Sequence, residues 1–427
     1  MNDFQFQKTT LANGLRVLTE RREEATSATL GVWIQAGSVF ETDDERGLAH
    51  LLEHLVFKGT QRHGMKQIAS LMDNLGGQMN AFTERELVCY HVKVLPDHVE
   101  KALGLLCDFI ARPSLNASDL EIERGVVLEE IHSVEDAPEE LVEDLFTETI
   151  WENSDWGRPI LGTEESVSAL QSDDLRRYLR SHYTPQNILI SATGDVRHEQ
   201  IVKLSEKLLR DLPQPQSSTR LRAQTPQAPI IKSHRKQLSR ETEQVHLCIG
   251  TRSCGYEDER RYVAGLLDSI LTGGYSSRLF QEIREKRGLC YSIGPMSAAY
   301  RQAAFWAVET SVAPPMAKKT VDIIGRELRK VKENGVSKSE LKRAQEMARI
   351  NLLLAEESSG SRMNRIARNE LYYGAQRSTQ DVLHEVQAVS LDDIQALARE
   401  MFDGSLMNLV AVGPFSDKAA PLQIDVG

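Results

Sequence analysis

Cysteine is scarce in this chain of 427 residues, and the few that occur are scattered. No two of them form a C-x-x-C pair, which excludes a disulfide framework and a C-x-x-C metal or redox site. Isolated cysteines are typical of reduced thiols that pack in the interior of a cytoplasmic protein. The five are Cys89, Cys107, Cys248, Cys254 and Cys290.

Long hydrophobic runs and a basic excess are also missing. No apolar stretch approaches the length of a membrane span, so we expect no membrane partner. The first residues lack a basic segment followed by an apolar run, and they do not resemble an Arg-rich transit peptide. The net charge of −11, without a basic stripe, argues against nucleic-acid binding. We therefore expect a cytoplasmic protein, with a chain long enough for two or more domains.

Two pairs of segments repeat at an offset of about half the chain. "TDDERGLAHLLEHL" (42–55) resembles "YEDERRYVAGLLDSIL" (256–271), and residues 172–196 resemble residues 390–415. Between the halves, residues 211–229 are rich in Pro, Gln and Ser, which is typical of a linker. We predict an N-terminal domain over 1–210 and a homologous C-terminal domain over 230–427.

Strand and helix patterns both occur in each half. Residues 9–22 and 25–37 alternate like strands, with a turn at Asn13-Gly14. Helical patterns follow near 46–58, 64–75, 97–110, 117–133 and 138–151. Because strands and helices do not alternate one for one, the sequence predicts an α+β fold. Each half would be an α/β sandwich, with a mixed, largely antiparallel sheet and helices on one face.

The segment "HLLEH" points to metal chemistry. On a helix, the leucines around it form one apolar stripe, and His50, Glu53 and His54 fall together on the other side. Two imidazoles at i and i+4 can each direct a ring nitrogen at one ion, and zinc most often takes such a pair. Glu53 lies where a carboxylate can deprotonate water. The alternative is a solvated polar helix face.

A third ligand is expected from "DLEIERGVVLEEIHSVED" (119–136). Glu123 and Glu130 are two turns apart and share a helix face, whereas Glu129 is rotated by about 100° from Glu130. One of these acids could complete a His-His-Glu site with an open fourth position. The alternative is an acidic, solvated helix face.

The repeat bears on this site. Aligning the two Leu-Leu pairs places Gly265 opposite His50, Asp268 opposite Glu53, and Ser269 opposite His54. The second half therefore keeps the helix without the ligands, which a single metal site in a duplicated protein would explain.

At this point the sequence resembles a known family. H-x-x-E-H is the inverzincin order, and with a glutamate further along it is similar to the pitrilysin and insulin-degrading-enzyme family of zinc metallopeptidases. Short bacterial members and the β-subunit of the mitochondrial processing peptidase are the most similar. The resemblance extends through "TTLANGLRV", "GGQMNAFTERELVCY" (76–90), "VVLEEI" (126–131), "YTPQNILISATGDV" (183–196) and "SSRLFQEIREKRGLCYSIG" (276–294).

The resemblance implies roles for residues of the first half. His50, His54 and Glu130 would bind one Zn²⁺ per chain, with Glu129 as the fallback ligand. Glu53 would be the general base, and Glu123 would be an acid that orients the site without binding the metal.

Further roles concern the substrate. Asn80, Ala81 and Phe82 resemble the edge strand that takes an extended peptide by β-addition. Arg284 and Tyr291 match the family's Arg and Tyr, which bind substrate and polarise the scissile carbonyl. Without the family, they would be interpreted as an exposed helix-end arginine and a core tyrosine. The family also implies a clamshell of the two halves around an enclosed chamber.

The leading functional hypothesis is a zinc endopeptidase that hydrolyses short or unfolded peptides. A non-catalytic scaffold or assembly subunit of the same family is one alternative, and a dedicated maturase of one precursor peptide is another. Because the chain carries both the zinc triad and the Arg/Tyr pair, we expect a homodimer. A heterodimer with an inactive homologue is the alternative assembly.

Overall fold

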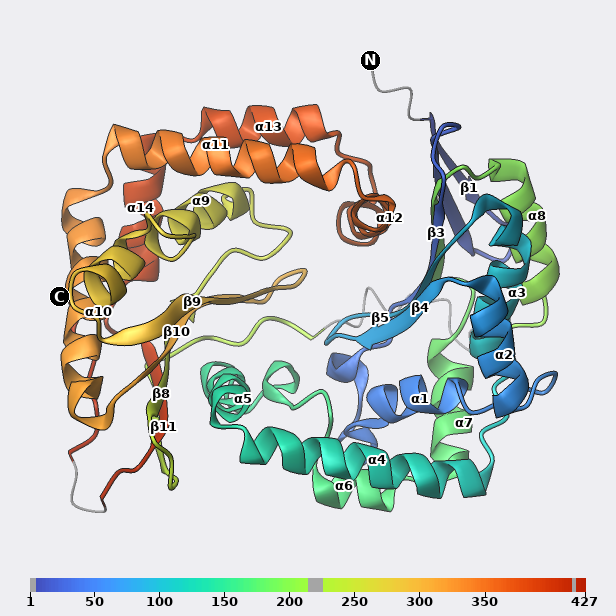
Figure 1. Cartoon of the computed structure of the whole chain (residues 1–427), viewed down its shortest axis with the longest axis horizontal. Helices are drawn as coiled ribbons and strands as arrows, with labels where there is room; N and C mark the ends of the chain where they lie inside the picture. Colours follow the sequence, from blue (N-terminus) through green and yellow to red (C-terminus); the bar gives the residue numbers. More distant parts are fainter. Residues whose placement is uncertain (1–4, 214–225, 417–419) are drawn as a thin grey trace. The chain divides into compact units, whose positions relative to one another are not determined.

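The computed structural model describes residues 5–213, 226–416 and 420–427, which form two compact units (Figure 1). The first unit contains residues up to 131, 158–226 and 354–376, and the second contains 132–157, 227–353 and 377–427. Residues 214–225, which make up most of the predicted linker 211–229, lie outside the described residues. The predicted domain limits stay a prediction.

The first unit is built on a six-stranded sheet in the order β1-β2-β6-β3-β5-β4. All neighbours are antiparallel except β2 and β6, which run parallel. The strands are β1 (Gln5–Thr10), β2 (Arg16–Arg21), β3 (Ala28–Ile34), β4 (Gln78–Thr83), β5 (Val88–Val94) and β6 (Ile188–Gly194). The helices are α1 (Leu48–Val56), α2 (Met65–Leu75), α3 (Val99–Ala111), most of α4 (Ala117–Asp136), α6 (Glu164–Ala169), α7 (Ser172–His182), α8 (His198–Leu209) and α12 (Ser359–Arg368).

The second unit is built on a five-stranded sheet in the order β7-β11-β8-β10-β9, in which only β7 and β11 run parallel. The strands are β7 (Arg235–Ser239), β8 (Val245–Arg252), β9 (Cys290–Ala299), β10 (Ala304–Val312) and β11 (Asn408–Gly413). The helices are α5 (Pro138–Ile150), α9 (Arg261–Leu271), α10 (Ala317–Asn334), most of α11 (Lys338–Ala355), α13 (Thr379–Ala388) and α14 (Leu391–Met401).

The two sheets confirm the internal repeat. The order β2-β6-β3-β5-β4 has the same connectivity and directions as β7-β11-β8-β10-β9, and β1 is an additional edge strand. Helix α1 follows β3 as α9 follows β8. The mixed α/β fold with two similar halves is therefore the one that the sequence predicts.

One face of each sheet is covered as expected by helices close in sequence. In the first unit, α3 and α8 pack on this face through a core that includes Leu30, Val32 and Phe109. The opposite face carries α12, which comes from the C-terminal half of the chain and packs on β3 and β6. Gly31 of β3 permits this approach, because an added Cβ would lie 2.5 Å from the sulfur of Met363.

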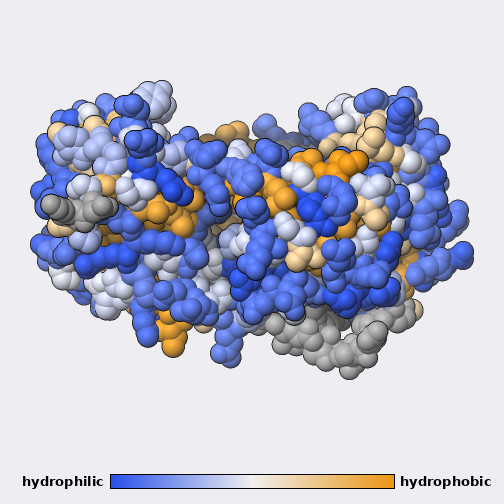
Figure 2. Space-filling view, turned by 90° about the horizontal axis from the view of Figure 1, so that it is seen from below, coloured by the Kyte–Doolittle hydropathy of each residue, from blue (hydrophilic) through white to orange (hydrophobic). Residues whose placement is uncertain are grey.

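The second unit shows the reciprocal arrangement, since α5 comes from the N-terminal half and packs on β8 and β11. Hydrophilic residues predominate on the molecular face drawn in Figure 2, with hydrophobic residues in smaller groups between them. Among the described residues, no helix combines the length and the apolar character that a membrane span requires.

Candidate metal centre

Helix α1 carries the H-x-x-E-H segment, and its apolar stripe forms as predicted. Leu48, Leu51, Leu52 and Leu55 are all buried in the core of the first unit. This burial fixes the rotation of the helix about its own axis. The polar side, with His50, Glu53 and His54, is thereby directed away from that core.

The start of α1 is fixed by Glu41, which lies six residues before Gly47, the residue that precedes the helix. The two carboxylate oxygens of Glu41 accept hydrogen bonds from the backbone N–H groups of Gly47 (3.0 Å) and Ala49 (2.7 Å). Glu41 thus satisfies two of the amides that a helix leaves unpaired at its N-terminus. Gly47 has φ +84°, which favours glycine, and a Cβ there would lie 2.5 Å from the carbonyl oxygen of Leu161.

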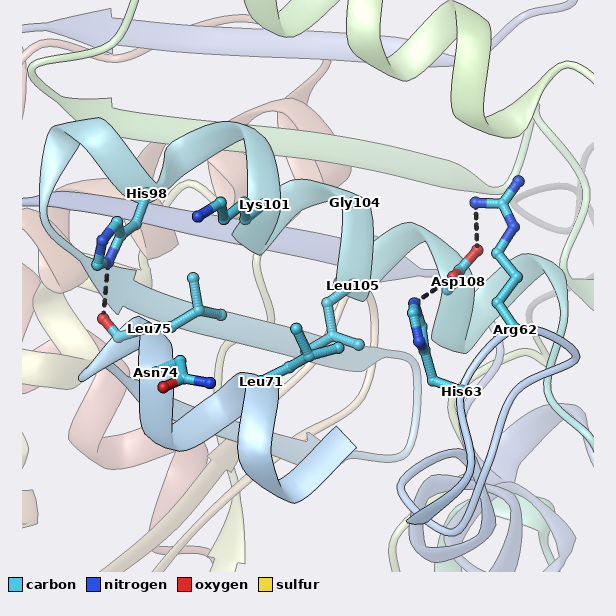
Figure 3. Close-up of a pocket in the computed structure, with 10 residues that line it drawn as sticks. All are labelled: Arg62, His63, Leu71, Asn74, Leu75, His98, Lys101, Gly104, Leu105 and Asp108. Atoms are coloured by element: carbon cyan, nitrogen blue, oxygen red, sulfur yellow. Dashed lines mark hydrogen bonds and ion pairs between the residues drawn. The ribbon is translucent and has the colours of Figure 1, made fainter. Parts of the chain in front are cut away.

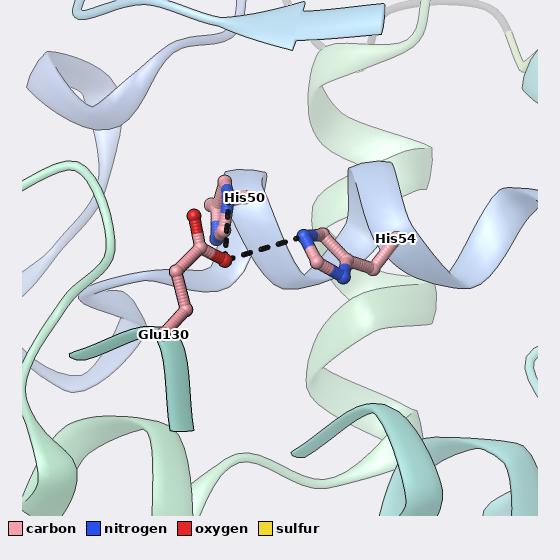
Figure 4. Close-up of side chains that lie close together, drawn as sticks. All are labelled: His50, His54 and Glu130. Atoms are coloured by element: carbon pink, nitrogen blue, oxygen red, sulfur yellow. Dashed lines mark ion pairs between the residues drawn. The ribbon is translucent and has the colours of Figure 1, made fainter. Parts of the chain in front are cut away.

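His50, His54 and Glu130 come together at one point (Figure 4). One ligand atom from each lies within 4.8 Å of the other two. Glu130 Oε2 is 3.8 Å from His50 Nε2 and 3.7 Å from His54 Nε2. Three ligands about 2.1 Å from a tetrahedral zinc would stand about 3.4 Å apart, so this donor set fits the ion closely. Glu129 is exposed and is not part of the cluster.

A buried carboxylate holds His54. Glu123 Oε2 lies 3.1 Å from His54 Nδ1, on the side of the ring opposite the cluster. Glu123 is 3% exposed, and its other oxygen pairs with the ammonium of Lys58 at 2.5 Å. Because the carboxylate accepts from Nδ1–H, the lone pair of His54 is placed on Nε2, which faces Glu130.

Glu53 is held by the neighbouring strand. The hydroxyl of Thr83, the last residue of β4, donates a hydrogen bond of 2.5 Å to Glu53 Oε2. Burial raises the pKa of Glu53 above its ordinary value, and the bond from Thr83 acts in the opposite direction. A carboxylate with a raised pKa is a better proton acceptor at neutral pH.

His50 is suited to act as a neutral ligand. Burial, and then the positive charge of a protonated His54, lower the pKa of His50 to about 4. Its imidazole is therefore uncharged at neutral pH, which is the form that binds metals.

Strand β4 lies at the edge of the first sheet, where it pairs with β5 as its only neighbour among the described strands. Asn80, Ala81 and Phe82 lie in its middle. Phe82 packs edge-on against Trp33, and Thr83 on the same strand holds Glu53. A peptide that added to this edge would run beside α1.

Arg284 and Tyr291 belong to the second unit. Arg284 lies in a π-helix (Phe280–Glu285), and Tyr291 in β9, the edge strand of that sheet. The Arg284 guanidinium lies over the rings of Phe280 (4.8 Å) and Tyr291 (5.3 Å). Tyr291 is 85% exposed, so it is not a core residue. No carboxylate among the described residues pairs with Arg284, so its charge is available to a ligand.

The second unit has no equivalent cluster among its described residues. Asp268, which the repeat aligns with Glu53, accepts hydrogen bonds from Trp306 Nε1 (2.7 Å) and from the Thr272 hydroxyl (2.6 Å). Burial raises the pKa of Asp268, while both hydrogen bonds lower it. Its oxygen is committed to packing the helix on the sheet.

Three residues that support the site were not foreseen. Glu41 caps α1, Lys58 pairs with Glu123, and Thr83 holds Glu53. Their roles depend on contacts with partners that local periodicity does not indicate. Of the three, only Lys58 could have been predicted to lie near the site, because it follows His54 by one helical turn.

Comparison with known proteins places the chain in a family. A model described as insulinase (peptidase family M16) matches residues 16–164, and one described as the peptidase M16 inactive domain matches residues 169–348. A Streptomyces coelicolor protein named an uncharacterized zinc protease is 37% identical, over 97% of this chain and 91% of its own length. A Bacillus subtilis protein with the same description is 34% identical, over 92% of this chain and 95% of its own.

Two solved structures share the fold. A Pseudomonas fluorescens structure described as a peptidase M16 inactive domain has a TM-score of 0.89 at 19% identity, covering 98% of this chain and 100% of its own. A Helicobacter pylori protease has a TM-score of 0.87 at 20% identity, covering 96% and 100%. The family models and the curated relatives together span nearly the whole sequence, and the chain therefore belongs to the insulinase family, peptidase family M16.

Proposed function

We propose that this protein is a zinc-dependent endopeptidase that hydrolyses peptides bound in an extended conformation. The observation that carries the proposal is the convergence of His50, His54 and Glu130 beside Glu53. Two imidazoles and one carboxylate form a three-ligand set of the kind that catalytic zinc sites use. The names of the relatives as zinc proteases support the same metal and reaction class.

The residues around this cluster divide metal binding and proton transfer among them in this proposal. His50 and His54 provide neutral nitrogen ligands, and Glu130 provides the charged oxygen ligand. Glu123 sets the tautomer of His54. A zinc ion held there would polarise the scissile carbonyl and lower the pKa of water. Because Thr83 holds Oε2 of Glu53, we expect the other carboxylate oxygen to take the proton from water and then deliver it to the leaving amine.

The substrate class follows from strand β4. Pairing with its open edge requires a segment with unpaired backbone N–H and C=O groups, which an extended peptide offers along its whole length and a folded protein offers only at exposed sheet edges. We therefore propose short or unfolded peptides as substrates, with Asn80, Ala81 and Phe82 on the receiving strand. By resemblance, we propose that Arg284 and Tyr291 contribute to substrate binding, for which the exposed ring and the guanidinium without a carboxylate partner are suited.

The decisive test compares wild-type protein with Glu53→Gln on a mixed pool of peptides analysed by mass spectrometry. Loss of the base should lower the cleavage rate by about 10²-fold or more, while zinc content stays near one ion per chain. Glu129→Gln is the matched control, since it removes the same charge from an exposed neighbour of the cluster and should leave both values unchanged. Equal digestion by wild type and Glu53→Gln, or digestion by neither, would refute the proposal.

A further inference from the structure

A pocket of about 550 Å³ lies between α2 and α3 of the first unit (Figure 3). Three leucines, Leu71, Leu75 and Leu105, form its apolar wall, and its two ends are polar. The volume falls in the range of roughly 300–1,000 Å³ that is typical of sites for small ligands. None of the lining residues takes part in the candidate metal centre.

At one end of the pocket, the acidic and basic side chains form ion pairs with one another. Asp108 is 2% exposed, and its carboxylate pairs with Arg62 (3.1 Å), Arg112 (3.3 Å) and His63 (3.9 Å). Among the described residues that line the pocket, Asp108 is also the only acidic one. With its charge already neutralised, this end offers nothing to a cationic ligand.

The other end carries an uncompensated positive charge. His98 lines this end of the pocket and donates from Nδ1 to the carbonyl oxygen of Leu75 (3.0 Å), which fixes the position of its ring. Lys101 follows one turn later on the same face of α3 and forms no ion pair with any residue that the structure describes. The nearby acids Asp97 and Glu100 do not line the pocket. The charge at this end is complementary to an anion.

A glycine lines the pocket between these two ends. Gly104 lies in the interior of α3, where glycine costs roughly 1 kcal/mol relative to alanine. No atom lies within 4 Å of the position that its Cβ would take. Packing within the protein therefore does not require this glycine, whereas any larger side chain would occupy the pocket.

We propose that this pocket binds a small molecule with an apolar body and a single carboxylate head. The head lies at the ammonium of Lys101, which forms no ion pair within the part of the chain that the structure describes. The body lies on Leu71 and Leu105, over the space that Gly104 leaves open.

The test uses octanoate as the probe and measures binding to the full-length protein by calorimetry. Octanoate should bind saturably, whereas acetate lacks the body and octylammonium has the wrong charge, so both should bind at least about tenfold more weakly. Lys101→Glu should weaken octanoate binding by about tenfold or more for the same reason.

Gly104→Leu separates the pocket from general damage to the fold. The new side chain enters open space and replaces a helix-interior glycine, so thermal stability should be maintained or raised while octanoate binding is lost. Gly265→Leu is the matched control, because this glycine also lies inside a helix, α9, with no atom within 4 Å of an added Cβ. It should bind octanoate like the wild type.

Three results would overturn the proposal. They are absence of saturable octanoate binding to the wild type, octylammonium binding as tight as octanoate, and unchanged octanoate affinity in a folded Gly104→Leu variant. Zinc content and peptide cleavage are measured separately and do not enter this test, so its failure is distinguishable from failure of the proposed function.

Discussion

The contact between Glu123 and His54 allows a quantitative prediction for zinc affinity. Glu123→Gln keeps the shape of the side chain but removes the charge from the acceptor that lies 3.1 Å from His54 Nδ1. Glu123 is 3% exposed, so solvent has little access to replace the lost interaction. Changes to such outer-shell partners typically weaken metal binding by about 10- to 100-fold, which corresponds to about 1.4–2.7 kcal/mol.

The size of the effect should depend on the replacement. The amide oxygen of glutamine can still accept from Nδ1–H, so we expect Glu123→Gln near the lower limit, with about tenfold weaker binding. Glu123→Ala removes the acceptor entirely and should approach the upper limit. Lys58 loses its ion-pair partner in both variants. Its side chain is 28% exposed and can turn toward water, so the effect on folding should be smaller than the effect on zinc.

The zinc dissociation constants of the wild type and the two Glu123 variants can be measured by competition with a chromophoric chelator. Glu121→Gln is the control, because Glu121 lies on the same helix but is largely exposed and pairs only with Arg124 among the contacts described. It should bind zinc like the wild type. Equal zinc affinity in wild type, Glu123→Gln and Glu123→Ala would show that His54 does not depend on this carboxylate, and the proposed role of Glu123 in orienting His54 would be wrong.

Three further predictions concern stability. Glu20→Gln leaves Arg362 and Arg365 to share the carboxylate of Glu356 and should lower the free energy of unfolding in urea by about 2 kcal/mol. A loss below about 0.5 kcal/mol would contradict this. Gly47→Ala combines φ +84° with a clash against a backbone carbonyl, so Tm should fall by several degrees, and an unchanged Tm would count against the strain. Glu340 has its pKa lowered to about 2 by hydrogen bonds from Arg278. This pair should therefore stabilise the protein by about 1 kcal/mol at neutral pH relative to Glu340→Gln. The difference in free energy of unfolding between the two proteins should vanish as pH falls from about 4.5 to about 2, where the carboxylate of Glu340 is protonated. An unchanged difference at pH 2 would show that the ionised Glu340 is not its source.

Helix α1 was predictable because all its information is local. Four leucines at helical spacing determine which side is buried, and His50, Glu53 and His54 then share the opposite side. The predicted helix near 46–58 corresponds to Leu48–Val56 in the structure. The same periodicity predicted α4, where the sequence left Glu123, Glu129 and Glu130 open as partners for the histidines.

The choice among those three acids needed more than periodicity. The seven-residue spacing put Glu123 and Glu130 on one face, but it could not tell which would reach a shared ion and which would support a ligand. That distinction depends on where α4 crosses α1, a property of tertiary packing. In the structure Glu123 contacts Nδ1 of His54 and Glu130 faces Nε2, so the two acids approach the same ring from opposite sides.

Contacts between distant segments could not be predicted from the sequence either, because they too depend on tertiary packing. Nothing in the local pattern of α12 indicates that it packs on β3 and β6, more than 150 residues away in sequence. Its polar residues look like a solvated helix, yet Arg362 is 5% exposed and pairs with Glu20. A charge pattern on a helix does not distinguish solvent from a buried partner, so such pairs become visible only in three dimensions.

The duplicated scaffold separates what determines the fold from what determines the chemistry. Both halves keep the Leu-Leu pair that buries a helix against the same five-strand arrangement, and the scaffold therefore does not depend on the residues that we propose as metal ligands. In the second half, Asp268 aligns with Glu53, and its carboxylate accepts hydrogen bonds from Trp306 and Thr272. In the first half, Oε2 of Glu53 accepts one hydrogen bond, from Thr83, whereas both hydrogen bonds to Asp268 end on its Oδ1. A carboxylate that packs a helix on its sheet and one that we propose as a proton acceptor thus occupy equivalent places in the two halves, with two protein donors on the first and one on the second among the described contacts.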